Sequence, residues 1–147
     1  MYKRILVAVD GSKTSNLALN EAIKLAKDQR ATLRLIHVVD ETPIYMMAEV
    51  PYSIDEYQKS MREAGRKELV KCAARAKAAR VKFDTKLVFT ITRSIADMIN
   101  QEAKRWSANL IVIGTHGRRG FNRLVLGSVA ERVVRLAVKP TLIIHGR

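Results

Sequence analysis

The sequence is poor in cysteine, aromatic residues and long apolar runs. Cys72 is the only cysteine, so no disulfide can form within the chain, which fits a reducing compartment. No stretch approaches the roughly 20 apolar residues of a membrane span. The apolar run near the start is short and ends at Asp10, unlike that of a signal peptide. We therefore expect a cytoplasmic protein with no membrane partner.

Acidic residues are also scarce, with 14 Asp and Glu against 27 Lys and Arg and a formal net charge of +13. Such an excess suits nucleic acid, a membrane surface or an anionic ligand. Many of the cations, such as Lys67, Lys71 and Arg75, lie along expected helices, where solvation alone explains them. A nucleic-acid partner is disfavoured, because aromatics make up only 5% of the residues and no nucleic-acid-binding motif is present.

Apolar patterning indicates strands and helices that alternate along the chain. The expected strands are 5–9, 32–39, 81–90, 110–113 and 141–145, and the expected helices are 12 or 15–29, 53–80, one capped at Ser94 and one from Ser128 to before Pro140. Strand 81–90 alternates apolar and charged residues, which suits an edge strand. The order predicts one α/β domain, 1–147, with an open twisted parallel sheet of five strands and helices on both faces.

The segment 40–51 interrupts this alternation. It holds two prolines, Pro43 and Pro51, and we expect neither a continuous helix nor a strand there. Loops of this length in a compact domain are often binding segments.

The clearest chemical signal follows the fourth strand. Its apolar run ends at Gly114, further glycines stand at Gly117 and Gly127, and an apolar helical period then begins. Glycine lets a ligand approach the backbone closely. Ser128, with Glu131 three residues later, has the pattern of a capping box, and the N–H groups and dipole of a helix start favour an anion. The stretch is therefore predicted to bind phosphate.

Three arginines, Arg118, Arg119 and Arg123, lie inside this glycine-marked loop. Either they act near a bound phosphate or an acidic partner, or they are only solvated. Their position in the loop favours the first interpretation.

The spacing Gly114-x2-Gly117-x9-Gly127-Ser128, with Thr115-His116 after the first glycine, resembles the nucleotide-binding signature G-x2-G-x9-G-[ST] of the universal stress protein family. The resemblance covers essentially the whole chain. It implies a Rossmann-like sheet of order 3-2-1-4-5, in which the first and fourth strands meet at a topological switch point. In the branch of the family that binds nucleotide, the crevice there holds ATP, here expected with Mg²⁺. The resemblance also implies a homodimer through the fifth strand.

The resemblance assigns two groups of residues to the ATP site. The base and ribose end matches Ala8, Val9, Asp10 and Val38. The phosphate end matches Gly114, Thr115, His116, Gly117, Arg118, Gly127, Ser128 and Val129. One departure is visible, because the family often has a glycine after the third strand, where this chain has Thr90-Ile91-Thr92-Arg93. This difference would reshape the pocket entrance.

Asp10 has a second interpretation. It follows the first strand, at the edge where open α/β sheets bind ligands. It could instead cap the next helix or form a turn with Gly11. Asp10 and Asp40 are candidate Mg²⁺ contacts, and His116 is either a base or a histidine bound to the backbone. No catalytic residue is assigned, and the sequence leaves open whether the protein is an enzyme, at most a slow ATPase.

Three functions fit these patterns. The complete glycine pattern favours an ATP-binding stress-response or signalling protein. The alternative is a non-catalytic protein-interaction module that uses the basic loop and the segment 40–51, and a basic nucleic-acid binder is least favoured. His37, Cys72 and Trp106 are expected to pack in the core rather than to bind metal, react or stack on a ligand.

Overall fold

The computed structural model describes residues 1–46, 54–116 and 126–146. Within these ranges the elements follow one another as β1 (Arg4–Ala8), α1 (Lys13–Gln29), β2 (Thr32–Asp40), α2 (Thr42–Met46), α3 (Ile54–Ala78), β3 (Lys82–Thr90), α4 (Ile95–Arg105), β4 (Leu110–Gly114), α5 (Ser128–Leu136) and β5 (Thr141–Ile144). None of the helices in the described part of the chain is both long and apolar enough to span a bilayer.

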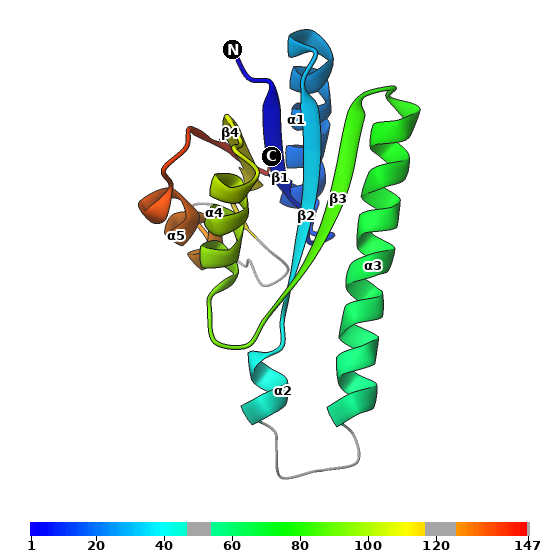
Figure 1. Cartoon of the computed structure of the whole chain (residues 1–147), viewed down its shortest axis with the longest axis vertical. Coiled ribbons are helices and arrows are strands. Elements are labelled where there is room, and N and C mark those ends of the chain that lie inside the picture. The colour runs from blue at the N-terminus through cyan, green and yellow to red at the C-terminus, as the bar shows by residue number, and fades with distance from the viewer. Residues whose placement is uncertain (47–53, 117–125, 147) are drawn as a thin grey trace.

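The strands form one parallel sheet of five, in the order β3-β2-β1-β4-β5. This confirms the expected fold class and strand order. Strand β3 is an edge strand, as its alternating pattern predicted. Figure 1 shows α3 on one side of the strands and α4 and α5 on the other, with α2 at the end of the molecule where β2 finishes.

Two apolar clusters fill the space between the sheet and its helices. Because successive strand residues point to opposite faces, Ile5 and Val7 pack under α1 and α3, whereas Leu6 and Ile36 pack under α4 and α5. The first cluster includes Ala18, Leu19 and Ala22 of α1 and Leu69, Cys72 and Ala76 of α3, and the second includes Ala96 and Ile99 of α4 and Ala130 and Val133 of α5. Both faces of the sheet are therefore covered, which explains the uninterrupted apolar runs of β1 and β4.

The segment 40–51 is more regular than the sequence indicated, because α2 occupies part of it. The Asp40 side chain starts this helix, since its Oδ1 accepts a hydrogen bond of 2.9 Å from the Thr42 backbone N–H. Pro43 lies in the first turn, where a missing N–H removes no intrahelical hydrogen bond. A short helix over 42–46 is compatible with the expectation of no continuous helix across the segment. The remainder of the segment lies outside the described residues.

Gly65 explains how α3 lies so close to the sheet. A Cβ at this position would stand 2.9 Å from His37 Cδ2, 3.0 Å from Leu87 and 3.1 Å from Val39. The helix accepts glycine, which costs about 1 kcal/mol relative to alanine, because only glycine leaves room for these side chains. His37 is buried beneath it and its Nδ1 lies 2.7 Å from the Val9 carbonyl oxygen, so this histidine packs in the core as expected.

Cys72 also lies in the core, on α3. Burial, together with the neighbouring Glu68 carboxylate, raises the pKa of its thiol to about 12. The thiolate, which is the reactive form, is therefore almost absent at neutral pH. Cys72 is a packed side chain, as the sequence predicted.

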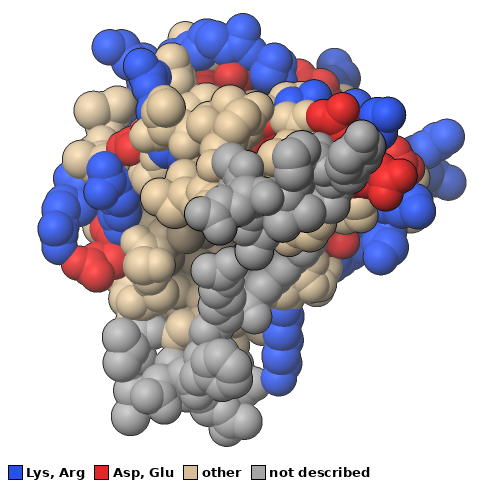
Figure 2. Space-filling view, turned by 90° about the horizontal axis from the view of Figure 1, so that it is seen from below, with Lys and Arg blue, Asp and Glu red and all other residues tan. Residues whose placement is uncertain are grey.

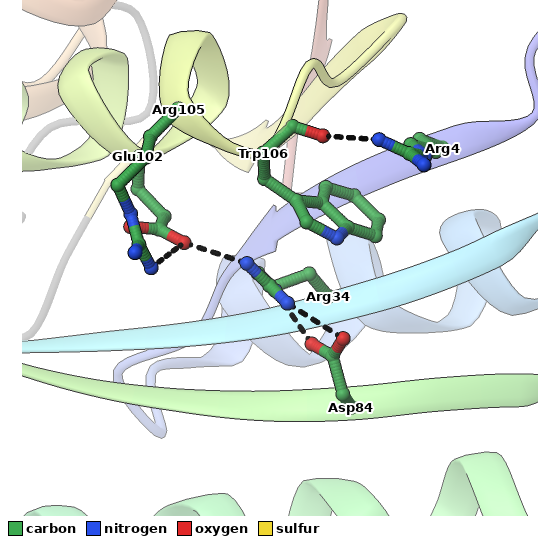
Figure 3. Close-up of polar contacts among 6 residues, drawn as sticks. All are labelled: Arg4, Arg34, Asp84, Glu102, Arg105 and Trp106. Atoms are coloured by element: carbon green, nitrogen blue, oxygen red, sulfur yellow. Dashed lines mark hydrogen bonds and ion pairs between the residues drawn. The ribbon is translucent and has the colours of Figure 1, made fainter.

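An ionic network around the buried Glu102 joins α4 to the sheet (Figure 3). Arg34 of β2 donates two hydrogen bonds to Asp84 of β3, of 2.6 and 2.7 Å, and one of 2.8 Å to Glu102 of α4. Glu102 also accepts hydrogen bonds of 2.9 and 3.0 Å from Arg105. The Arg34 guanidinium lies 4.7 Å from the centre of the Trp106 ring. Trp106 therefore packs as expected, against the apolar cluster beneath α4 and α5 and also against this cation.

A second buried carboxylate, Glu41, lies between β2 and α2. Only 1% of its surface is exposed. It accepts hydrogen bonds from Arg62 of α3, at 2.5 and 3.0 Å, and from Gln58, at 2.9 Å. The Arg62 hydrogen bond holds the pKa of Glu41 below its ordinary value of 4.5, although burial opposes this. The charged pair ties the beginning of α3 to the end of β2.

Candidate functional site

The carboxyl ends of β1 and β4 lie side by side at the point where the strand order reverses. β1 pairs with β2 along one of its edges and with β4 along the other. In the second pair, Val7 of β1 lies opposite Val112 of β4. Open α/β sheets bind ligands in the crevice at such a point. Figure 2 views this end of the molecule, where uncharged side chains occupy much of the middle and Lys and Arg lie towards the rim.

Asp10 follows β1 and lies in a tight turn. Its Oδ1 accepts a hydrogen bond of 2.9 Å from the Ser12 N–H, and its own N–H donates to Ser15 Oγ at 3.1 Å. Gly11 takes a φ of +80°, which glycine tolerates without strain. The turn with Gly11, one of the two interpretations of Asp10, is thus present. Its half-buried carboxylate still lies at the switch point, so a ligand role stays a prediction.

Gly114 ends β4 against the first turn of α1. A Cβ there would stand 2.6 Å from both the carbonyl carbon and Oγ1 of Thr14, and 2.8 Å from Ser15 N. Gly114 is also fully enclosed at this position. Its first role is therefore to let helix and strand meet, not to admit a ligand.

The first turn of α1 holds the start of the glycine-marked loop. Ser12 Oγ donates a hydrogen bond of 3.2 Å to the His116 carbonyl oxygen, and Thr14 Oγ1 donates to the same oxygen. The His116 N–H in turn donates to Thr14 Oγ1 at 3.3 Å. Two hydroxyl groups thus fix both backbone polar groups of His116. The sequence analysis missed them, because nothing in the sequence pairs 12–14 with a residue about a hundred positions later.

The His116 side chain is enclosed on the loop. Its Nδ1 lies 3.0 Å from Thr115 Oγ1. Its Nε2 is buried and has no hydrogen-bond partner among the residues that the structure describes. Gly117 and Arg118, like Arg119 and Arg123, lie outside the described residues.

The loop closes where Gly127 meets Thr115. The Gly127 N–H donates to the Thr115 carbonyl oxygen at 2.7 Å, and a Cβ on Gly127 would stand 2.7 Å from that same oxygen. The absence of a side chain therefore permits the closure. The two ends of the loop are held beside each other at the start of α5.

The start of α5 differs from the predicted capping box. Gly127, not Ser128, is the N-cap, because its carbonyl accepts the first intrahelical hydrogen bond, 2.9 Å from the Glu131 N–H. Ser128 is the first helical residue and is exposed. The Ser128 capping box was thus wrong by one residue. No side chain from the described part of the chain caps the first-turn N–H groups, which leaves them for water or an anion.

Three of the apolar residues matched to the site lie in one layer of the molecule. Ala8 of β1, Val38 of β2 and Val129 of α5 are half-buried and pack against the cluster beneath α4 and α5. Val9 faces the opposite layer and is 3% exposed. Its N–H donates to Ile36 at 2.9 Å and its carbonyl lies 2.7 Å from His37 Nδ1. The structure thus places Ala8, Val38 and Val129 in the same layer and turns the Val9 side chain to the other.

The geometry suits a ligand with an apolar part and an anionic part. The half-buried side chains of Ala8, Val38 and Val129 line one face, and the uncapped start of α5 adjoins them. Among the described residues, no group of three or more His, Cys, Asp and Glu side chains is placed to hold a metal ion.

The sequence of this chain matches the Universal stress protein family over residues 1–145. The chain belongs to the universal stress protein family. It is 35% identical to a universal stress protein of Methanocaldococcus jannaschii, over 98% of this chain and 82% of the relative. It is 36% identical to a universal stress protein of Burkholderia pseudomallei of solved structure, with a TM-score of 0.80, over 99% of this chain and 97% of that one.

Other universal stress proteins of similar fold have been solved with adenine nucleotides. One from Archaeoglobus fulgidus holds dAMP (22% identity, TM-score 0.67, 97% of this chain and 98% of that one). One from Arabidopsis thaliana holds AMP (18% identity, TM-score 0.70, 97% and 90%). Another universal stress protein holds cAMP (24% identity, TM-score 0.66, 98% and 97%). At these identities the likeness to this chain shows the fold alone.

Proposed function

We propose that this universal stress protein binds ATP with Mg²⁺ at the switch point between β1 and β4, and acts in the cytoplasm as a nucleotide-dependent stress-response or signalling module. The observation that carries the proposal is the start of α5, where first-turn N–H groups without a side-chain cap adjoin a half-buried apolar face. The adenine nucleotides bound by structural neighbours support the same choice of ligand.

Each end of the nucleotide has a matching part of the site. The apolar side chains of Ala8 and Val38 would cover the base and ribose, and the α5 N–H groups, with Val129 in the same turn, would receive a phosphate. Mg²⁺ usually binds through phosphate oxygens and one or two carboxylates, for which Asp10 is the residue at the crevice. Ser12 and Thr14 would position the loop through the His116 backbone. Turnover would need further groups that orient the attacking water, so the proposal concerns binding.

Ser128 gives a direct test of the phosphate position. The change Ser128→Glu places a carboxylate on the first residue of α5, where a negative charge stabilises the helix by about 0.5 kcal/mol. The same charge would repel a phosphate at the helix start. We expect isothermal titration calorimetry with MgATP to show binding by the native chain that is lost in Ser128→Glu, while the melting temperature is maintained or slightly raised.

Ser128→Gln is the matched control, with nearly the same shape and no charge. It should keep MgATP binding within a few-fold of the native affinity. Loss of binding in both variants would point to the shape of the side chain rather than to its charge. An absence of heat with the native chain, for ATP, ADP and AMP alike, would refute the proposed function.

We also propose a homodimer through β5. All four residues of this edge strand are only half-buried, and Val134, on the neighbouring α5, is 41% exposed. An exposed edge with apolar side chains is a surface that proteins normally cover. Light scattering after size-exclusion chromatography should give twice the chain mass of 16.6 kDa. A mass of one chain at micromolar concentration would contradict the dimer.

A further inference from the structure

Cations from separate parts of the sequence gather at the end of the molecule opposite the candidate site. In a parallel α/β fold the helices finish where the strands begin, and Figure 1 shows the finishing ends of α1 and α3 at the same end as the N-terminus. We call this surface the basic end and define it by six cations, two at the end of each of three helices. They are Lys27 and Arg30 at the end of α1, Lys77 and Arg80 at the end of α3, and Lys104 and Arg105 at the end of α4. All six are exposed. Cations that look dispersed in the sequence are thus brought together by the fold.

The helix dipoles do not account for this charge. Each helix end carries a partial charge of about −0.5, so a single cation outweighs it. Each of the three helices has two. The strand starts add Lys3 and Lys82, which lie on no helix and are also exposed.

Few carboxylates neutralise the basic end. Glu102 is buried and bound by Arg34 and Arg105, and Asp84 is bound by Arg34. Asp28, between Lys27 and Arg30, is the exposed carboxylate at the end of α1 and accepts a hydrogen bond of 2.9 Å from Gln29. In contrast, the side chains of Lys27, Lys82 and Lys104 make no ion pair or hydrogen bond within the described ranges. Their charge therefore faces solvent and any approaching polyanion.

We propose that the basic end binds the phosphate backbone of double-stranded nucleic acid without reading its sequence. A duplex offers closely spaced phosphates, and neutralising them with Lys and Arg releases counterions. No base-reading element is present among the described residues of this end, because the helices present their last turns rather than a flank. The Trp106 ring lies between the guanidinium groups of Arg34, at 4.7 Å, and Arg4, at 5.8 Å, and so offers no platform for a base.

A lipid surface is the competing partner for this end. Proteins that lie on anionic bilayers insert apolar side chains beside their cations. Met1 and Tyr2 before β1, and Leu136 and Val138 before β5, are exposed, so binding to vesicles is measured beside binding to the duplex. The six cations of the basic end come from the ends of α1, α3 and α4.

Fluorescence anisotropy with a labelled DNA duplex of about 20 base pairs tests the proposal at about 50 and about 200 mM NaCl. The variant Lys27→Gln/Lys82→Gln/Lys104→Gln removes three charges from this end. The control Lys59→Gln/Lys67→Gln/Lys71→Gln removes three exposed charges from α3 away from its end and leaves the same net charge. Circular dichroism checks that all three proteins are folded.

We expect the native chain to bind the duplex with an affinity that falls steeply with salt. The basic-end variant should bind at least tenfold more weakly at about 50 mM NaCl, with its salt slope reduced by about 3, and the control variant should stay within about threefold of the native chain. Equal weakening of the two variants would overturn the proposal and attribute binding to net charge alone. An absence of duplex binding at the lower salt would also overturn it. Binding to phosphatidylserine vesicles without binding to the duplex would overturn it in favour of a lipid partner.

Discussion

Replacing Gly114 by alanine is expected to lower the free energy of unfolding by about 3 kcal/mol, at the upper end of the usual cost of overpacking. The added Cβ would lie 2.6 Å from the Thr14 carbonyl carbon and 2.8 Å from the Ser15 nitrogen. These are backbone atoms of the first turn of α1, so the clash is relieved only if the whole helix shifts. Urea unfolding measures the loss, as a lower midpoint at an unchanged slope.

Gly146→Ala is the matched control, because it also adds a methyl group facing Thr14. Its Cβ would meet only the Thr14 side-chain methyl, at 3.1 Å. A rotating side chain can give way, so we expect a loss below about 1 kcal/mol. Similar losses in the two variants would show that contact with the α1 backbone is not what makes Gly114 necessary.

The elements of this fold could be predicted from the sequence because their signals are local. The apolar run before Gly114 and the alternation in 81–90 each lie within one strand, and both strands formed with boundaries shifted by a residue or so. The capping box expected at Ser94 is present with Asp97, since all of its atoms come from four consecutive residues.

The place of the glycine-marked loop was predicted, but not the contacts that its glycines make. The glycine spacing located the loop correctly between β4 and α5. It could not show that Gly114 and Gly127 make room for protein backbone, because Thr14 and Thr115 are brought to them only by folding. The cap of α5 moved from Ser128 to Gly127 for a similar reason, since the hydrogen bond to Thr115 fixes where the helix begins.

Buried charges were the least predictable part. Glu102 lies next to Ala103 and three residues after Ile99, on the buried face of α4. A buried carboxylate is normally paired with a cation. The sequence contains 27 Lys and Arg, however, and does not show which of them pairs with Glu102. The pairing of β2 with β3 places Arg34 beside Asp84, and the packing of α4 on the sheet brings Glu102 to it.

That dependence makes Glu102→Ala the second change with a large expected effect, a loss of about 3 kcal/mol in the free energy of unfolding. The Glu102 side chain is 7% exposed and is bound by Arg34, whose own side chain is 18% exposed. Removing Glu102 leaves Arg34 with Asp84 but without one of its two acidic partners, in a poorly solvated place. Glu131→Ala is the control, because Glu131 pairs with Arg135 on the exposed surface of α5. We expect it to cost about 0.5 kcal/mol or less.

The pH dependence of this loss identifies its cause. Burial alone would raise the pKa of Glu102, but the hydrogen bonds from Arg105 and Arg34 outweigh it and hold the pKa below its ordinary value of 4.5. A carboxylate with a lowered pKa in the folded state stabilises the protein above its unfolded pKa, and this contribution is lost as the pH falls through the folded pKa. The difference between the native chain and Glu102→Ala should therefore be full at pH 7 and shrink well below pH 4.5. A difference that stays constant when urea unfolding is repeated in acid would attribute the loss to packing of the side chain, not to the ionised carboxylate.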